Sequence, residues 1–249
     1  MLAEERLARI VEVVEREGTA TVAKLAELLG TSESTIRRDL DKLDQAHRLV
    51  KVHGGATARE AAHLSRDLTL SERHGLHDEE KRVIAGYAAT LIEPDDFVYI
   101  DAGTSTEALV ACIAETRALY VTDSVSHALA LAARGCRVTV LGGELKSATE
   151  ALVGPDAIAS LERYHFTLGF WGANGITSQA GFTTPDRSEA QVKQVSMEHT
   201  ERRYVLSDAS KFGRTGLVSF APFEYAQILT AGTVPDEYRN FENIVEVGR

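Results

Sequence analysis

The apolar positions at the start of the chain repeat at the spacing of a helix. Leu7, Ile10, Val11 and Val14 lie three or four positions apart with charged residues between them, and Gly18 follows. This spacing gathers the apolar side chains on a single helical face. The pattern predicts a first helix that ends at Gly18, because glycine commonly terminates a helix.

Two more helical patterns follow, with a sharp corner between them. The earlier one covers 22–29 and ends at Gly30, and the later one begins after a cap at Thr31/Ser32. Residues 48–56 then alternate between apolar and polar side chains and reach a pair of glycines, which predicts a small two-stranded wing. The N-terminal pattern is therefore three helices followed by a β-ribbon.

The rest of the chain has a different pattern. From residue 78, short β-rich runs alternate with amphipathic segments. Such alternation indicates an α/β fold with a largely parallel sheet, which binds ligands at the carboxyl ends of its strands. The expected strands are 97–101, 119–122, 138–141, 167–172, 204–207, 227–230 and 244–247, and the expected helices are 81–92, 106–113, 126–133, 156–163 and 188–201.

These patterns divide the chain into three parts. We expect a winged helix-turn-helix domain at 1–57, a linker at 58–77 and an α/β domain at 78–249. The linker holds histidines at positions 63, 74 and 77, whose irregular spacing favours solvated side chains over a metal site.

Charge is distributed unevenly between these parts. The net charge is −10; residues 1–60 contain 10 Lys and Arg against 11 Asp and Glu, and the remaining residues contain 17 against 26. The acidic larger part would repel a phosphate backbone. Any nucleic-acid binding must therefore be local to the N-terminal part.

The composition predicts a cytoplasmic protein without a metal or cofactor. The apolar runs are too short to cross a bilayer, and the charged start lacks a signal sequence. Cys112 and Cys136 lack the spacing of a metal or redox motif, so we expect buried thiols and no disulfide.

Helix, short corner, helix is the pattern of a helix-turn-helix, whose second helix reads base edges in the major groove. Ser32, Ser34 and Thr35 supply hydroxyls near the start of that helix, where backbone N–H groups also attract phosphate. Arg38 suits the two-pronged contact with guanine, and Arg37 suits phosphate. The alternative is a protein-binding module whose arginines are simply solvated.

The segment from Thr21 to Ala56 resembles the DNA-binding signature of the DeoR family of bacterial repressors. The matching motifs are S-x-x-T-I-R-R-D-L at Ser32–Leu40 and H-G-G-A at His53–Ala56. The resemblance implies that this region binds double-stranded operator DNA. The residues it assigns to the contact are Ser32, Ser34, Thr35, Arg37 and Arg38, with Lys51 and His53 of the wing.

A second motif, YIDAGTSTEAL, follows an apolar strand and opens a helix. Gly103 permits a sharp turn, and Thr104, Ser105 and Thr106 offer hydroxyls beside N–H groups, which suits an anion. The loop lacks the lysine of a Walker loop and the GxGxxG of a dinucleotide fold, so neither ATP nor NAD is implied. An ordinary strand-to-helix turn remains the alternative.

Later segments also resemble the DeoR family, whose sensor domain is similar to ribose-5-phosphate isomerase and binds phosphorylated sugars. The matching blocks include DAGTST, GANGI, GFTTPD, EAQVK and ASKFG, and GGELKSATEALVG is similar to the fructose-operon and lactose-phosphotransferase repressors. That subgroup implies fructose 1-phosphate or a related ketohexose phosphate as effector. The residues assigned to it are Asp101, Gly103, Thr104, Ser105, Thr106 and Lys211, with Lys146, Thr183, Asp186 and Glu189 as weaker candidates.

The chain departs from the family pattern at two positions. Thr167 replaces an Asp found in many relatives, and Trp171 replaces a smaller residue. Both are expected beside the pocket strand, where they would affect sugar selectivity.

The function predicted from these features is transcriptional repression of a phosphotransferase-type sugar operon, relieved by the sugar phosphate. Homo-oligomers, dimers or tetramers, would present recognition helices to repeated half-sites. One alternative is a ketose/aldose phosphate isomerase with an appended helical module, but Asn174 stands where such isomerases have an Asp, and Asn cannot act as the base. Another is a scaffold that does not bind DNA. We expect no enzymatic activity.

Overall fold

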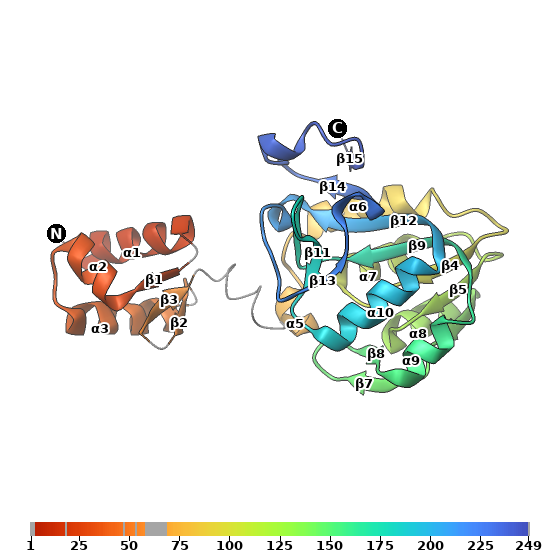
Figure 1. The fold of residues 1–249 in the computed structure, drawn as a ribbon, viewed down its shortest axis with the longest axis horizontal. Helices are drawn as coiled ribbons and strands as arrows, with labels where there is room; N and C mark the ends of the chain where they lie inside the picture. The colour runs from red at the N-terminus through yellow and green to blue at the C-terminus, as the bar shows by residue number, and fades with distance from the viewer. Residues whose placement is uncertain (1–2, 18, 47, 53, 58–68, 249) are drawn as a thin grey trace. The chain divides into compact units, whose positions relative to one another are not determined.

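The computed structural model describes residues 3–17, 19–46, 48–52, 54–57 and 69–248. The chain forms two compact units, Met1–Arg66 and Asp67–Arg249, which are considered separately (Figure 1).

The first unit contains the expected three helices and a small antiparallel sheet in the order β1-β3-β2. The wing was expected to have two strands, but Thr19–Thr21 pairs with its second strand and adds a third. The elements are α1 (Ala3–Glu17), β1 (Thr19–Thr21), α2 (Val22–Leu29), α3 (Glu33–Gln45), β2 (Val50–Val52) and β3 (Gly55–Thr57).

The two wing glycines have different structural roles. Gly54 has a φ of 83°, a left-handed conformation that glycine adopts without strain. At Gly55, an added Cβ would lie 2.3 Å from the carbonyl oxygen of Ala20 in β1. Gly55 therefore allows β3 to approach β1 closely.

The helices of this unit pack around one apolar core. Ile10 and Val14 of α1, Leu25 of α2, and Ile36 and Leu40 of α3 are all fully buried. The helical spacing seen in the sequence thus places one face of each helix in the core and leaves the opposite face of α3 exposed.

The second unit is an α/β fold whose main sheet, over the described residues, has seven parallel strands in the order β15-β14-β12-β9-β4-β5-β6. All seven predicted strands are present. They are β4 (Phe97–Ile100), β5 (Leu119–Thr122), β6 (Arg137–Val140), β9 (Phe166–Gly172), β12 (Thr200–Asp208), β14 (Gln227–Ala231) and β15 (Ile244–Glu246).

Helices cover both faces of this sheet (Figure 1). The chain builds outward from β4 through β5 to β6, then returns to the other side of β4 and builds outward from β9. A ligand crevice is expected where this order reverses, between the carboxyl ends of β4 and β9. The helices are α6 (Asp78–Ala89), α7 (Thr104–Cys112) and α8 (Val125–Ala133) on one face, and α9 (Pro155–Leu161) and α10 (Arg187–Glu198) on the other.

Short elements that the sequence pattern did not indicate complete the second unit. They are the hairpin of β7 (Glu144–Lys146) and β8 (Ala151–Val153), the three-stranded sheet of β10 (Gly175–Thr177), β11 (Gly181–Thr184) and β13 (Val218–Ala221), and the 3₁₀ turns η1 (Ala209–Lys211), η2 (Phe223–Tyr225) and η3 (Asp236–Tyr238).

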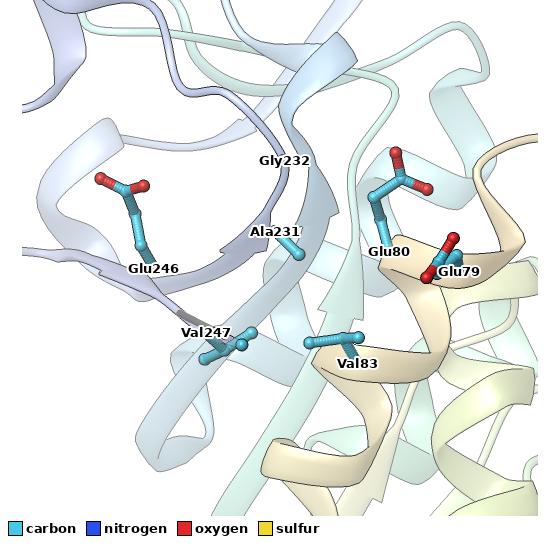
Figure 2. Close-up of a pocket in the computed structure, with 8 residues that line it drawn as sticks. Glu79, Glu80, Val83, Ala231, Gly232, Glu246 and Val247 are labelled. Atoms are coloured by element: carbon cyan, nitrogen blue, oxygen red, sulfur yellow. The ribbon is translucent and has the colours of Figure 1, made fainter.

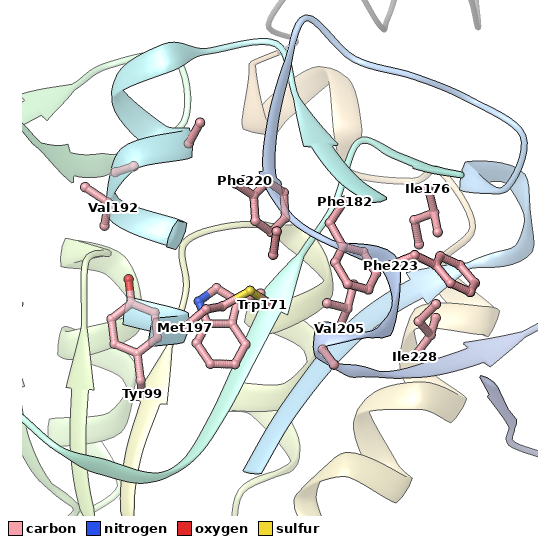
Figure 3. Close-up of a cluster of buried hydrophobic side chains, with 14 of the residues drawn as sticks. Tyr99, Trp171, Ile176, Phe182, Val192, Met197, Val205, Phe220, Phe223 and Ile228 are labelled. Carbon is pink, nitrogen blue, oxygen red and sulfur yellow. The ribbon is translucent and has the colours of Figure 1, made fainter. Parts of the chain in front are cut away.

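Trp171 lies at the centre of the larger aromatic core (Figure 3). Its ring is fully buried and stacks on Tyr99 with a centroid distance of 5.6 Å. Its indole N–H donates to Ser196 Oγ at 2.9 Å, so α10 is attached to β9. Gly169 provides the space, because a Cβ there would lie 2.2 Å from the indole ring.

The linker predicted at 58–77 extends too far. Residues 69–77 are packed on the second unit and include the short helix α5 (Leu70–Arg73). Thr69 and Glu72 form a capping box, in which each side chain bonds the other residue's backbone N–H. Sequence periodicity missed this helix because a single turn is too short to show it.

Candidate functional site

Three hydroxyl side chains meet at the first turn of α3. Ser32 is the N-cap, and its Oγ accepts a hydrogen bond from the Thr35 N–H at 3.3 Å. The same oxygen lies 3.0 Å from Ser34 Oγ and 2.9 Å from Thr35 Oγ1. Because a helix N-terminus attracts anions, this turn suits a phosphate group.

The two arginines of α3 are both exposed but differ in their partners. Arg37 Nη2 lies 2.9 Å from Glu33 Oε2, one helical turn earlier. Arg38 forms no ion pair with any other residue that the structure describes. Arg38 is therefore available for a ligand without breaking an ion pair within the part of the chain that the structure describes.

The aspartates that follow these arginines are engaged in contacts within the unit. Asp39 is buried and forms an ion pair with Arg6 of α1 at 2.6 Å. Asp41 pairs with the Lys51 ammonium, and Asp44 accepts the Lys51 N–H at 3.1 Å. These carboxylates hold α1 and the wing against α3, so their charges are partly neutralised.

Of the two wing residues predicted to contact DNA, the structure describes only Lys51. Lys51 lies in β2 and is tied to α3 by these two contacts. His53 lies outside the described residues.

The loop after β4 places a helix N-terminus at the carboxyl edge of the sheet. Gly103 has a φ of 149° and caps α7, and its carbonyl accepts the Glu107 N–H at 2.8 Å. The Thr106 side chain, predicted to contact phosphate, is instead fully buried and donates to the same carbonyl at 2.9 Å. Thr104 and Ser105 are half-buried, and their N–H groups belong to the first helical turn, which lacks internal partners.

Asp101 was also predicted to hold the phosphate, but its carboxylate is 1% exposed. It accepts the Gly172 N–H at 3.0 Å, which joins the ends of β4 and β9, and forms an ion pair with Lys193. A buried carboxylate with these partners shapes the loop and would repel a phosphate. Lys193 was missed, although a lysine on the apolar stripe of α10 beside Ala190 and Met197 is the signal that could have revealed it.

Asp123, at the end of β5, supports the same loop. Its Oδ1 accepts the Ala102 N–H at 2.7 Å. Burial, and after it the neighbouring charge of Asp101, raise the pKa of Asp123 well above its usual value. Asp123 was not among the predicted residues.

Three of the weaker candidates lie together at the start of α10. Lys146 Nζ is 3.0 Å from both Asp186 Oδ2 and Glu189 Oε1. Asp186 caps the helix by accepting the Glu189 N–H at 2.9 Å, and Thr149 donates to Glu189. Partial burial acts to raise the pKa of Asp186, but the hydrogen bonds from the Glu189 amide and Lys146 outweigh it, so the pKa is lowered.

Lys211 lies at the carboxyl end of β12, as predicted. Its Nζ is 3.9 Å from Asp208 Oδ2, and its side chain is 30% exposed. Burial acts to raise the pKa of Asp208, but the Lys211 charge and the hydrogen bonds from Ser210 lower it overall. Lys211 is thus a cation held at the edge of the crevice.

Thr183 does not present its side chain to the crevice. It is fully buried, its hydroxyl donates to the Gly175 carbonyl at 3.0 Å, and its oxygen accepts the Gly216 N–H at 2.7 Å. Thr183 therefore stabilises the small sheet, which sequence spacing could not reveal.

Residues 69–248 contain four lysines, and all four lie at this end of the acidic unit. Lys146, Lys193 and Lys211 pair with carboxylates described above, and the buried Lys81 interacts electrostatically with Asp208 and Lys211. Burial lowers the pKa of Lys81. The concentration of lysines marks one end of the sheet as the place for an anion.

A pocket of about 350 Å³ beside the ends of β14 and β15 has the opposite character (Figure 2). Glu79, Glu80 and Glu246 line it together with Val83 and Val247. Its carboxylates would repel a phosphate. The lysine-bearing crevice is therefore the better anion site.

Thr167 was expected beside the pocket, but it lies at the opposite end of β9. Its hydroxyl donates to Asp96 Oδ1 at 2.6 Å, and Arg202 contacts the same oxygen at 2.6 Å. The side chain at position 167 therefore contributes to contacts at the amino end of the sheet and does not contribute to sugar selectivity. Trp171 is a core residue that reaches α10.

Two further observations concern the described residues. No group of three His, Cys, Asp or Glu side chains is arranged to hold a metal ion. None of the helices in this part of the chain has the length and apolar character needed to span a membrane.

Comparisons with known proteins agree with this two-part arrangement. Residues 6–62 match the DeoR-like helix-turn-helix domain, and residues 76–232 match the DeoR C terminal sensor domain. The chain is 36% identical over 243 residues to the uncharacterized HTH-type transcriptional regulator FruR of Bacillus subtilis (strain 168), covering 97% of this chain and 96% of the relative. It is 31% identical over 223 residues to the lactose phosphotransferase system repressor of Streptococcus mutans serotype c, covering 88% of each.

Among solved structures, the chain is similar to ribose 5-phosphate isomerase A from Methanocaldococcus jannaschii, with a TM-score of 0.41, 12% identity and 55% of each chain covered. The family matches cover both units, and the relatives above are named as regulators of transcription and not as enzymes. The chain belongs to the DeoR family, and it is a transcriptional regulator with an N-terminal helix-turn-helix domain and a C-terminal α/β sensor domain.

Proposed function

We propose that this protein represses a phosphotransferase-type sugar operon and that a ketohexose phosphate, fructose 1-phosphate in the first instance, relieves the repression. The observation that carries the proposal is the gathering of all four lysines of residues 69–248 at the end of the sheet where α7 begins. Homo-oligomers, dimers or tetramers, would present α3 to repeated half-sites.

On the DNA side, Arg38 is the proposed base reader and Arg37 the proposed phosphate contact. Arg38 is exposed and has no ion pair among the described residues, whereas Arg37 is already near Glu33. Arg38→Ala should lose about 1 to 3 kcal/mol of discrimination between operator and mutated operator. Arg37→Ala, the matched control, should weaken binding to both DNAs equally.

Fluorescence anisotropy with labelled operator measures both variants at one fixed salt concentration. If Arg38→Ala weakens binding equally on every DNA sequence, Arg38 is a phosphate contact and the assignment is wrong.

On the effector side, the N–H groups of Thr104 and Ser105 and the ammonium of Lys211 would bind the phosphate. Asp186 and Glu189 would accept hydrogen bonds from sugar hydroxyls, because ionised carboxylates are strong acceptors. Asp101 would hold the loop without touching the ligand, given its burial. The lactose phosphotransferase system repressors among the relatives support a sugar-related effector.

The test begins with a thermal-shift screen of fructose 1-phosphate, fructose 6-phosphate and ribose 5-phosphate, with unphosphorylated fructose as the control. Hits are then titrated into complexes with DNA from upstream of the protein's own gene. Lys211→Ala and Thr104→Ala should keep operator binding and lose the effector response. Arg163→Ala, an exposed cation near the end of α9, should change neither. A normal response in both site variants would contradict this placement of the pocket.

A further inference from the structure

A short segment at the start of the second unit contacts the β7–β8 hairpin, α6 and α7, which carry or adjoin candidate effector residues. This segment, Thr69–His77, which we call the strap, includes α5 and directly follows residues 58–68. The capping box between Thr69 and Glu72 makes its first turn a defined element and not an irregular tail.

The first contact joins the strap to the β7–β8 hairpin. The Leu70 N–H donates to the Ala148 carbonyl at 3.0 Å. Ala148 lies between Lys146 and Thr149, whose side chains both bond Glu189. A ligand that moved Lys146 would therefore also move the Ala148 carbonyl, which accepts the Leu70 N–H.

The second contact is made by Lys81, the buried lysine near the start of α6. Its Nζ donates to the Arg73 carbonyl, the last residue of α5, at 3.0 Å. The same ammonium interacts electrostatically with Asp208 and Lys211 at the end of β12. An anion bound at Lys211 would change the field at Lys81 and so the strength of this contact.

The third contact connects the strap to the helix of the phosphate loop. His74 Nε2 lies 2.7 Å from Glu107 Oε2, in the first turn of α7. A groove of about 430 Å³ is lined by His74, Lys81, Thr104 and Glu107 among others, so the strap has open space beside the loop.

The end of the strap is conformationally strained. His77 has a φ of 54°, which non-glycine residues rarely adopt, and Gly75 has a φ of 80°. Local preference therefore does not fix this conformation. His77 is the N-cap of α6, where its carbonyl accepts the Lys81 N–H at 3.0 Å and its ring lies 3.6 Å from Glu80 Oε1.

We propose that the strap is the element through which effector binding changes operator affinity. The proposal rests on the proposed function above. Two of the three contacts involve elements that carry ligand candidates, the β7–β8 hairpin and α7, and the third involves Lys81, which interacts electrostatically with the candidate Lys211. In the sequence, no other described element lies between the strap and the DNA-binding unit. Ligand binding would alter these contacts and so the conformation of the strap, from which the chain leads to the DNA-binding unit.

The first test removes strap contacts without touching the candidate ligand residues. Leu70→Pro deletes one N–H at the first position of a helix, where proline is well tolerated, and Thr69 has a ψ of 157°, which suits a residue before proline. It is combined with His74→Ala. Leu70→Ala is the matched control, because it shortens the side chain and keeps the N–H.

Fructose 1-phosphate is the probe, with operator affinity measured by anisotropy and direct ligand binding by calorimetry. Wild type and Leu70→Ala should show the same change in operator affinity, within the usual range of about 5- to 150-fold. The double variant should still bind fructose 1-phosphate and operator. The ratio of its operator affinities with and without ligand should fall to about 1, because a ligand that binds two conformational states equally well does not change their populations. A full response in the double variant would overturn the proposal.

A second test needs no ligand, so it separates failure of the strap from failure of the proposed function. Lys146→Met removes the ion pairs beside Ala148, and hydrogen exchange is followed at the Leu70 amide. Exchange should become several-fold faster at Leu70 and stay unchanged at Ile113, whose N–H donates to Leu109 at the end of α7. Unchanged exchange at Leu70 would overturn the strap proposal, whereas absence of fructose 1-phosphate binding to wild type would contradict only the effector.

Discussion

His127 provides a quantitative test of the environment beside the phosphate loop. Its side chain is 3% exposed in α8, and its Nδ1 has no hydrogen-bond partner among the described residues. Burial lowers the pKa of His127 from 6.5 to about 4, although Glu107 and the Gly103 carbonyl act in the opposite direction. The folded protein therefore keeps this ring neutral at pH values where the unfolded chain protonates it.

This difference makes the protein less stable in acid. Between pH 6.5 and about 4 the unfolded state binds more protons at His127 than the folded state, so stability falls as the pH falls. A pKa lowered by this amount corresponds to about 3 kcal/mol, at about 1.4 kcal/mol for each pH unit. His127→Gln removes the titration and should remove this part of the pH dependence.

Urea unfolding at pH 7.5 and pH 4.5, followed by tryptophan fluorescence, measures the effect. Trp171 is the single tryptophan and lies in the core of the second unit, so the signal reports on that unit. Wild type should lose about 2 to 3 kcal/mol more than His127→Gln on acidification. Parallel losses in the two proteins, or a His127 pKa near 6.5 by NMR, would refute the argument.

Two other substitutions test the wing and the buried carboxylates. Gly55→Ala should destabilise the first unit by about 1 to 3 kcal/mol or more in thermal melts followed by circular dichroism, because its Cβ would collide with a β1 carbonyl oxygen. Gly54→Ala meets no atom at its Cβ and should cost only about 1 kcal/mol, for placing alanine at a φ of 83°. A loss at Gly55 no larger than this would contradict the steric argument. Asp123→Asn should raise the urea midpoint reported by Trp171 at pH 7.5 but not at pH 4, because the fold opposes ionisation of Asp123 and this cost appears only above the unfolded pKa. A lower urea midpoint for Asp123→Asn than for wild type at pH 7.5 would show that the fold needs the negative charge of Asp123.

The sequence predicted the main elements well because they are long enough to show periodicity. The three N-terminal helices and all seven parallel strands follow from apolar spacing. The hairpins and small sheets at the carboxyl edge consist of strands of three or four residues, such as β7 and β10, whose pairing partners are set by tertiary contacts. Strands of this length carry too few positions for a period to be recognised.

Sequence reasoning placed the loops that carry the candidate site residues, but it did not predict the contacts among those residues. The loop at Gly103 and the placement of Lys211 at a strand end follow from the strand-to-helix order. The pairing of Asp101 with Lys193 could not be read from spacing, because these residues lie 92 positions apart. Thr183 illustrates the same limit: a hydroxyl in a matching motif can serve the fold and not the ligand.

The wide sequence separation of the crevice residues has a consequence for the lifetime of the protein. Lys146 and Glu189 are 43 positions apart, so their arrangement exists only when the second unit is folded. A metabolite held by such residues binds the native state alone, and at about 100 times its dissociation constant it would add about 2.7 kcal/mol to the stability of that unit. The sugar phosphate would then protect the regulator from proteolysis, and the amount of regulator in the cell would rise and fall with its own signal.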